Sequence, residues 1–269
     1  MIRRLVPYGL QRALDWKVRF QDMGLGELAA WRAAASRSMR QALLMSRIEY
    51  LPPALRTQLS LVVDVGANVG QWISAFLKFV IVERAEVFEP NPHVFTDLKA
   101  CLRDRPGVHL HNIAVGDQPG DLTLHVTHES TSSSLLPASD MRAKWCGPDA
   151  GIVSEIPVPV MPLDSMIPAG SVVDLLKVDV EGFERQVLTG GLETLKRTRA
   201  VLIEMHFESH WQGDAPFGII YNLLIGDLGF RFWDMSPLER EPRRGGRALW
   251  ADVAFVNPSM EPTGAWRKE

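Results

Sequence analysis

The sequence has few cysteines, no long apolar run and no glycosylation acceptor. Cys101 and Cys146 are its only cysteines, and one pair provides neither a disulfide framework nor the ligand spacing of a metal site. No apolar stretch reaches the roughly 18 residues of a membrane span, and no Asn-x-Ser/Thr triplet has a permitted middle residue. Arg12, Asp15 and Lys17 interrupt the segment where the apolar core of a signal peptide would lie. These absences predict a cytoplasmic protein in a reducing compartment.

The chain also lacks a strong excess of either charge. Its net charge is −3 and 46% of its residues are hydrophobic, which is ordinary for a soluble globular protein and gives no general attraction to nucleic acid. The charge is unevenly spread, because residues 1–50 contain nine basic and four acidic residues, a net +5 that leaves −8 for the remainder. We therefore expect no nucleic-acid partner for the molecule as a whole.

The basic segment has an amphipathic pattern as well. Its apolar residues recur at roughly helical spacing, at Leu25, Leu28, Ala29, Trp31, Ala35, Met39, Leu43 and Leu44. The segment either contacts an anionic membrane or covers a functional site, or it forms a helical hairpin that packs on the main domain with its basic face in solvent. The sequence leaves these interpretations open.

From residue 61 onward, short apolar runs alternate with helical patterns. We expect strands at 61–65, 85–88, 108–115, 121–127, 172–178, 200–206, 230–233 and 251–256, with a further extended segment at 156–160. Helices are expected over 70–80, 93–103, 182–189 and 216–227, and a long loop over 128–155. This alternation predicts a doubly wound, mostly parallel α/β sheet with helices on both faces. It divides the chain into an N-terminal helical extension over 1–55, an α/β domain over 56–257 and a poorly ordered C-terminal tail over 258–269.

The turn after the first strand of this domain contains the most specific motif. Its sequence, Asp64-x-Gly66-x-Asn68-x-Gly70, lies between a strand and a helix. Gly66 permits a sharp turn and a close approach of a ligand to the backbone, and the free N–H groups of the following helix point to the same place. A dinucleotide fingerprint would place glycine where Asn68 and Gln71 stand. A zwitterionic ligand such as S-adenosylmethionine tolerates these side chains, and Asp64 can bind its amino group directly or through water.

A second motif, Phe88-Glu89-Pro90-Asn91, ends the next strand. A carboxylate at the tip of the neighbouring strand can accept hydrogen bonds from both hydroxyls of a ribose. Such charge-assisted bonds contribute about 1.5–3 kcal/mol each, so Glu89→Ala should weaken cofactor binding about 10- to 100-fold. The structural alternative is that Glu89 only caps the following helix. Together the two motifs favour a nucleoside cofactor.

These motifs, together with three later ones, resemble FkbM-type methyltransferases. The later motifs are Asn112-Ile113-Ala114-Val115-Gly116, Ser133-Ser134-Leu135, and the run from Leu176 to Glu184 with the pattern Lys-x-Asp-Val-Glu-Gly-x-Glu. The resemblance covers about residues 61–207 and implies a class I methyltransferase fold, with the α/β domain as the catalytic domain. It also implies S-adenosylmethionine as cofactor and O-methylation of natural products, including sugars on polyketides and glycolipids. The cofactor-binding residues that follow are Asp64, Gly66, Ala67, Asn68, Gly70, Glu89, Pro90, Asn112, Ala114, Ser134 and Asp179, with Asn112 and Ala114 at the adenine and Ser134 in a nearby loop.

The acidic end of the strand over 172–178 is the candidate reacting centre. Lys177 and Asp179 fall on one face of that strand, because side chains alternate, and ligands of doubly wound sheets bind outside the carboxyl ends of the strands. Glu204 and His206 share a face of the next strand, so Asp179, Glu204 and His206 converge if the two strands are neighbours. We expect His206, near its normal pKa, to be the general base, oriented by Glu204 or Asp179. Lys177 is explained better as a counter-charge to Asp179 than as a catalyst.

A rival mechanism uses a divalent cation at the same place. Asp179 and Glu204 would bind it, and their hard oxygen ligands favour Mg²⁺ over Zn²⁺. The cation would acidify the acceptor hydroxyl. The sequence leaves both mechanisms open.

The leading functional interpretation is an O-methyltransferase that acts on a hydroxyl of a small molecule. The leading acceptor is a sugar of a glycolipid or of another natural product. A lipid-linked acceptor would fit peripheral membrane contact through the basic N-terminal segment. The alternatives are a non-catalytic nucleotide-binding protein and, least favoured, a nicotinamide oxidoreductase.

Overall fold

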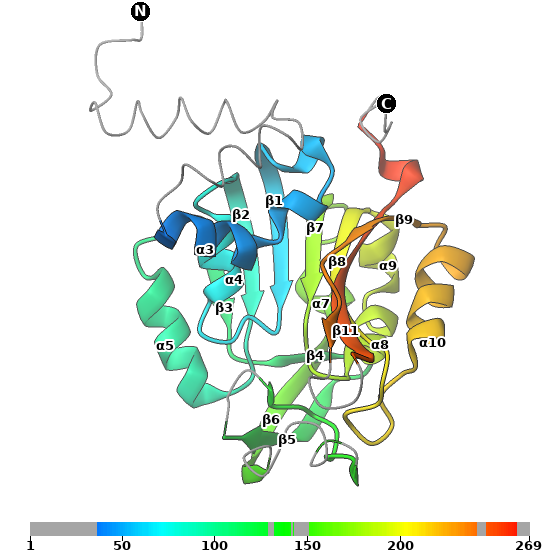
Figure 1. The fold of residues 1–269 in the computed structure, drawn as a ribbon. Coiled ribbons are helices and arrows are strands. Elements are labelled where there is room, and N and C mark those ends of the chain that lie inside the picture. Colours follow the sequence, from blue (N-terminus) through cyan, green and yellow to red (C-terminus); the bar gives the residue numbers. More distant parts are fainter. Residues whose placement is uncertain (1–36, 129–131, 141, 143–150, 241–245, 263–269) are drawn as a thin grey trace, which may run out of the picture.

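A mostly parallel sheet forms the centre of the molecule. The computed structural model describes residues 37–128, 132–140, 142, 151–240 and 246–262 (Figure 1). The strand order of the main sheet is β10-β11-β8-β7-β1-β2-β3, and β9 also pairs with β11. The strands are β1 (Gln58–Val65), β2 (Ile81–Phe88), β3 (Val108–His111), β7 (Val173–Val178), β8 (Thr198–His206), β9 (Arg231–Met235), β10 (Glu239–Arg240) and β11 (Ala248–Val256). The pairs from β3 to β8 are parallel, whereas β11 runs antiparallel to β8.

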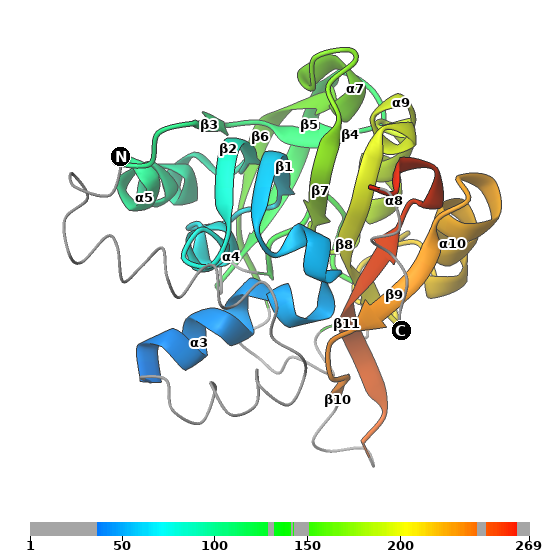
Figure 2. The same cartoon turned by 90° about the horizontal axis from the view of Figure 1, so that it is seen from above.

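Helices cover both faces of this sheet (Figure 2). One face carries α3 (Arg37–Ser46), the short η1 (Ile48–Tyr50), α4 (Gln71–Phe76) and α5 (Pro92–Leu102). The other face carries α7 (Leu163–Met166), α8 (Glu184–Thr189), α9 (Leu192–Lys196), α10 (Phe217–Tyr221) and the π-helical turn η5 (Asn222–Asp227). All six residues of β7 are buried, as expected for a central parallel strand with helices on both sides. The predicted doubly wound α/β sheet is confirmed.

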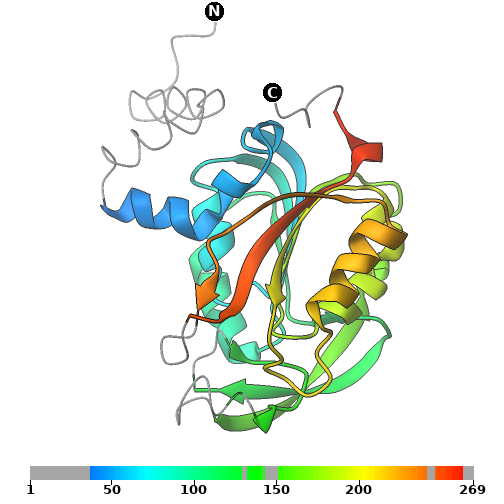
Figure 3. The ribbon, with the colours of Figure 1, turned by 45° about the vertical axis from the view of Figure 1, so that its right-hand side comes forward.

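A second, three-stranded sheet packs below the main one (Figure 3). Its order is β4 (Ala114–Gly116), β6 (Ile152–Pro162) and β5 (Gly120–Thr127). The single strand expected over 108–115 is therefore wrong, because β3 ends at His111 and β4 belongs to the other sheet. The expected loop over 128–155 is also too long, since β6 begins at Ile152 and pairs with β5 from Ile152 to Val160.

One helix start and the tail also differ from expectation. The helix expected from residue 182 begins at Glu184, because Glu181 and Gly182 have left-handed backbones with φ of 55° and 97°. The tail is ordered just after the last strand, where the buried Asn257 accepts a hydrogen bond from the N–H of Ser259 and starts a 3-10 helix. Residues 263–269 lie outside the described part of the chain.

The described end of the expected N-terminal extension is part of the main core. Leu43, Ile48, Leu51 and Leu55 are almost fully buried and pack in one cluster with Phe76 of α4. The rest of the extension, residues 1–36, lies outside the described residues, so its role stays a prediction. None of the helices in the described part of the chain has the length and apolar character that a membrane crossing requires.

Candidate active site

A cavity of about 200 Å³, partly open to solvent, lies along the carboxyl ends of the parallel strands. Eight of the predicted cofactor residues line it, namely Gly66, Ala67, Asn68, Glu89, Pro90, Ala114, Ser134 and Asp179. Asp64, Gly70 and Asn112 do not line it. Of the predicted catalytic residues, Lys177 and Glu204 line the cavity and His206 does not.

Glu89 is held at one end of the cavity by the backbone around it. Its Oε2 accepts a hydrogen bond from the N–H of Asn68 at 2.9 Å, and its Oε1 accepts one from the N–H of Asn91 at 2.8 Å. Burial raises the pKa of Glu89 to about 7, although these two N–H groups oppose the shift. The side chain of Asn112 donates to the carbonyls of Glu89 and Pro90 at 2.9 and 3.0 Å. Asn112 therefore fixes this turn rather than forming the cavity wall.

A close contact with the loop after β7 requires glycine at position 66. Its φ is +83°, and a Cβ on it would lie 1.8 Å from the carbonyl oxygen of Asp179. The N–H of Asp179 donates to Val65 O at 3.0 Å, and the N–H of Gly66 donates to Phe88 O at 3.1 Å. The backbone space beside Gly66 thus accommodates Asp179, where the sequence had suggested room for a ligand. These contacts bind the loops after β2, β1 and β7 into one rigid wall.

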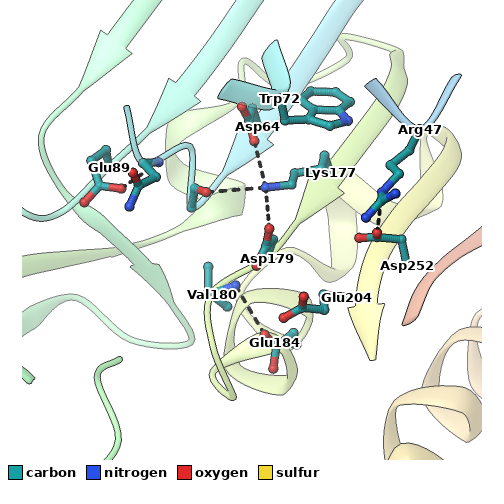
Figure 4. A network of polar contacts seen from close by, with 12 residues as sticks. Arg47, Asp64, Trp72, Glu89, Lys177, Asp179, Val180, Glu184, Glu204 and Asp252 are labelled. Carbon is teal, nitrogen blue, oxygen red and sulfur yellow. Dashed lines mark hydrogen bonds and ion pairs between the residues drawn. The ribbon is translucent and has the colours of Figure 1, made fainter. Parts of the chain in front are cut away.

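A buried lysine links two carboxylates in the middle of this wall (Figure 4). Lys177 Nζ lies 3.0 Å from Asp179 Oδ2 and 3.5 Å from Asp64 Oδ1, and it donates to Gly66 O at 3.4 Å. Burial would lower the pKa of Lys177, but Asp179 and Asp64 more than offset it and raise the pKa above its usual value. Asp64 is fully buried, and burial raises its pKa to about 6 against the effect of Lys177. Asp179, with 33% of its side chain exposed, is therefore the carboxylate of this group that a ligand can reach.

Glu204 and His206 meet as expected, but the charge on the histidine differs from the expectation. His206 Nε2 lies 3.1 Å from Glu204 Oε2. Burial lowers the pKa of His206, but Glu204, Glu184 and Glu181 more than offset it and raise the pKa to about 10. The surroundings of His206 thus favour its protonated form at neutral pH, so the expected normal pKa is wrong, while a role of His206 as general base stays a prediction. Burial and the nearby Asp179 raise the pKa of Glu204 well above its usual value.

Glu181 is a site residue that the sequence reasoning missed. It lines the cavity, and its Oε2 accepts a hydrogen bond from Trp211 Nε1 at 3.3 Å. Burial raises the pKa of Glu181 to about 7. Within the described residues, Glu181, Glu204 and His206 each offer one polar atom within 4.8 Å of the others. The expected cation pair of Asp179 and Glu204 is not this group. The available sequence signal was the position of Glu181 in the Asp-Val-Glu-Gly motif, directly after the strand that carries Lys177.

The far end of the cavity contains three more residues outside the predicted set, Arg47, Trp72 and Asp252. Arg47 Nε lies 2.7 Å from Asp252 Oδ2. Asp252 is the single acid in the apolar run of β11, which was a weak sequence signal, whereas nothing local marks Arg47. Met45 and Arg47 belong to the described end of the basic segment, so that end forms a wall of the site.

Comparison with known proteins shows that the chain is similar to methyltransferases. Residues 64–232 match the model of the methyltransferase FkbM domain. The chain is 25% identical over 174 residues to the 2-O-methyltransferase NoeI of Sinorhizobium fredii (strain NBRC 101917 / NGR234), and 29% identical over 192 residues to the 31-O-demethyl-FK506 methyltransferase FkbM of Streptomyces tacrolimicus. Each match covers 61% of this chain and 70% of the relative.

Two solved structures are similar at lower identity. The methyltransferase FkbM from Methylobacillus flagellatus KT is 18% identical with a TM-score of 0.47, and the match covers 75% of this chain and 44% of that one. The precorrin-6y C5,15-methyltransferase from Geobacter metallireducens GS-15 is 8% identical with a TM-score of 0.41, covering 81% and 87% of the two chains.

Proposed function

The chain belongs to the methyltransferase FkbM family, whose members use S-adenosylmethionine, and we propose that it methylates a hydroxyl group of a small-molecule acceptor. The acceptor we propose is a sugar of a glycolipid or of another natural product. The names of the two relatives support oxygen as the methylated atom, because both describe methylation at a numbered oxygen. The observation that carries the proposal is the row of carboxylates that faces one cavity, from Glu89 through Asp179 to Glu204.

The residues of the cavity suit this cofactor. Glu89 lies where a ribose would be bound, and its oxygens retain lone pairs for the hydroxyls. Phe88, Ile113 and Ala114 form an apolar wall beside it for the adenine. Asn68 and Asp179 lie farther along, where a carboxylate would favour a cation. S-adenosylmethionine supplies a methyl group on a positively charged sulfur, from which it is transferred in line to the acceptor oxygen.

We assign proton acceptance to Glu204 and a positioning role to His206. Glu204 lines the cavity, whereas His206 lies behind it and is already protonated. A carboxylate whose pKa is raised accepts a proton more readily, once ionised, than an ordinary one. The positive charge of His206 stabilises ionised Glu204 through their 3.1 Å contact. The acceptor hydroxyl would thus lose its proton to Glu204 as its oxygen takes the methyl group.

Two variants separate these roles. Glu204→Gln should reduce turnover by about 100-fold or more while S-adenosylmethionine still binds. His206→Asn removes a cation beside Glu204, so the pKa of Glu204 should rise and the rise of kcat with pH should move to higher pH. The measurement is kcat between pH 6 and 10 together with cofactor affinity. If His206→Asn abolishes turnover at every pH and Glu204→Gln does not, the histidine is the base.

A calorimetric titration with S-adenosylmethionine and a turnover assay together test the function as a whole. Each is run with Mg²⁺ in one series and a chelator in the other. We expect micromolar affinity and unchanged turnover in the chelator, since the proton route needs no cation. An absence of binding in both series would refute the assignment of the cofactor site. Loss of turnover in the chelator, restored by Mg²⁺, would favour a cation held by Asp179 and Glu204.

A further inference from the structure

The cavity extends past Glu204 to an end that the cofactor residues leave free. Along the sheet, Glu89 follows β2, Asp179 follows β7, Glu204 lies on β8, and Asp252 lies on β11, directly opposite Glu204. Neighbouring strands are about 4.8 Å apart, so four strand spacings place Asp252 on the order of 19 Å from Glu89. Figure 4 shows Glu89 and Arg47 on opposite sides of Asp179. With the nucleoside at Glu89 and the reaction near Asp179, the acceptor takes the end that Arg47 and Asp252 form.

Resting on the proposed function, we propose that the Arg47–Asp252 pair recognises the acceptor by binding two neighbouring hydroxyl groups. The pair is accessible, with 31% of the Arg47 side chain and 15% of the Asp252 side chain exposed. A hydroxyl both donates and accepts a hydrogen bond, a carboxylate only accepts, and a guanidinium only donates. The Arg47 N–H groups beyond Nε and the carboxylate of Asp252 therefore offer adjacent partners for a pair of ring hydroxyls.

The charges of this part of the cavity are balanced. Asp179, Glu181 and Glu204 lie between the Arg47–Asp252 end and the cofactor end, and Lys177 and His206 offset their negative charge at 3.0 Å from Asp179 and 3.1 Å from Glu204. The Arg47–Asp252 pair is itself neutral as a unit, which matches an uncharged polyol.

The fold holds Arg47 in this position. Its backbone is left-handed, with φ of 52°, at the step between α3 and η1. Leu43 and Ile48 on either side are fully buried, and Trp72 Nε1 donates to the carbonyl of Ser46 at 3.0 Å. The anchored turn points the guanidinium at Asp252, so this contact is a feature of the packed core and not of a free surface chain.

The test measures binding and methylation of simple sugars by the full chain. The probes are methyl α-D-glucopyranoside, methyl α-D-mannopyranoside, methyl α-L-fucopyranoside and methyl α-L-rhamnopyranoside, each beside a monodeoxy analogue. Binding is measured by saturation-transfer NMR with S-adenosylhomocysteine present, and methylation with radiolabelled S-adenosylmethionine. The wild type should bind and methylate at least one glycoside. Arg47→Gln and Asp252→Asn should raise its KM about tenfold or more, with kcat and the Kd of S-adenosylmethionine nearly unchanged.

The deoxy analogues identify the hydroxyls concerned. Removing one of the two should raise the wild-type KM about tenfold but should add little in Asp252→Asn, because the contact is already lost. Arg199→Gln is the matched control, since Arg199 pairs with Asp174 at 2.6 Å with 35% of its side chain exposed, near the amino ends of β8 and β7. It should leave KM unchanged. Arg47→Lys keeps the charge beside Asp252, and it replaces Arg47→Gln if that variant does not fold.

Three outcomes overturn the proposal. A wild type that binds S-adenosylmethionine but none of the glycosides refutes the diol site while the proposed cofactor function stands. Variants with wild-type KM and an unchanged preference over the deoxy analogues refute the role of Arg47 and Asp252. A wild type that does not bind S-adenosylmethionine refutes the proposed function, and this inference with it.

Discussion

Replacing Lys177 with methionine removes the only cation that contacts both Asp64 and Asp179 among the described ion pairs. Methionine fills a similar volume, so the loss is chiefly one of charge. Removing one partner of a buried ion pair costs about 3–5 kcal/mol, and we expect that loss in the free energy of unfolding at pH 7. Lys196→Met is the control, because Lys196 and its partner Glu193 are exposed and such pairs contribute at most about 1 kcal/mol.

The pH dependence of the Lys177→Met deficit is the sharper test. Asp64 has a raised pKa of about 6 in the folded wild type. Between its unfolded pKa and pH 6 only the folded state holds this proton, so the free energy of unfolding falls as pH rises to 6 and no longer changes with Asp64 above it. Without Lys177 its pKa rises further, and the folded variant keeps the proton. Above pH 6 the variant therefore continues to lose stability, and the gap to wild type should widen by about 1.4 kcal/mol per pH unit.

Urea unfolding followed by tryptophan fluorescence at pH 6, 7 and 8 measures this gap. Adding Asp64→Asn to Lys177→Met should remove the widening, since no carboxyl is then left to titrate at that position. A gap that is equal at pH 6 and pH 8, or below about 1 kcal/mol at pH 7, would refute the account of Lys177 as the neutralising charge.

Two further predictions concern the cofactor end. Wild-type affinity for S-adenosylmethionine should weaken below about pH 7, because protonation of Glu89 removes an acceptor for ribose hydroxyls. Glu89→Gln should bind about 10- to 100-fold more weakly and lose this pH dependence, and calorimetry at pH 6 and 8 would count against Glu89 if both proteins respond alike. Gly66→Ala should lower the free energy of unfolding by more than about 2 kcal/mol, since its Cβ meets Asp179 O at 1.8 Å in addition to the backbone strain. Gly213→Ala is the control, because Gly213 has a similar φ of +84° and a Cβ there would meet nothing within 4 Å. If both variants lower the free energy of unfolding equally, the contact with Asp179 O does not contribute to the loss.

The central strands could be predicted from the sequence because a strand buried on both faces is a continuous apolar run. β1, β7 and β8 are apolar runs bounded by turns, and each was placed to within three residues at either end. The break after His111 could not be predicted. The apolar character continues to Val115, and the chain leaves the sheet where Asn112 binds carbonyls of the turn after β2, which is 22 residues or more away in sequence.

The candidate site divides in the same way. Glu89, Asn68 and Asp179 follow strands directly, so the rule for the carboxyl ends of strands brought them together in advance. The protonation of His206 could not be predicted, because it depends on how far three glutamates lie from one buried ring. Arg47 and Asp252 are 205 residues apart, and only the strand order makes them partners.

The antiparallel β11 has a consequence for how this enzyme can change. It brings a residue from the end of the chain to the same cavity that α3 reaches from the beginning, and both lie outside the range 64–232 that the family shares. The part of the cavity that lies within residues 64–232 and the part formed by Arg47 and Asp252 therefore meet between β8 and β11. Under the role proposed for Arg47 and Asp252, a substitution at either position is expected to change which acceptor is methylated and to leave Glu89, Asp179 and Glu204 in place.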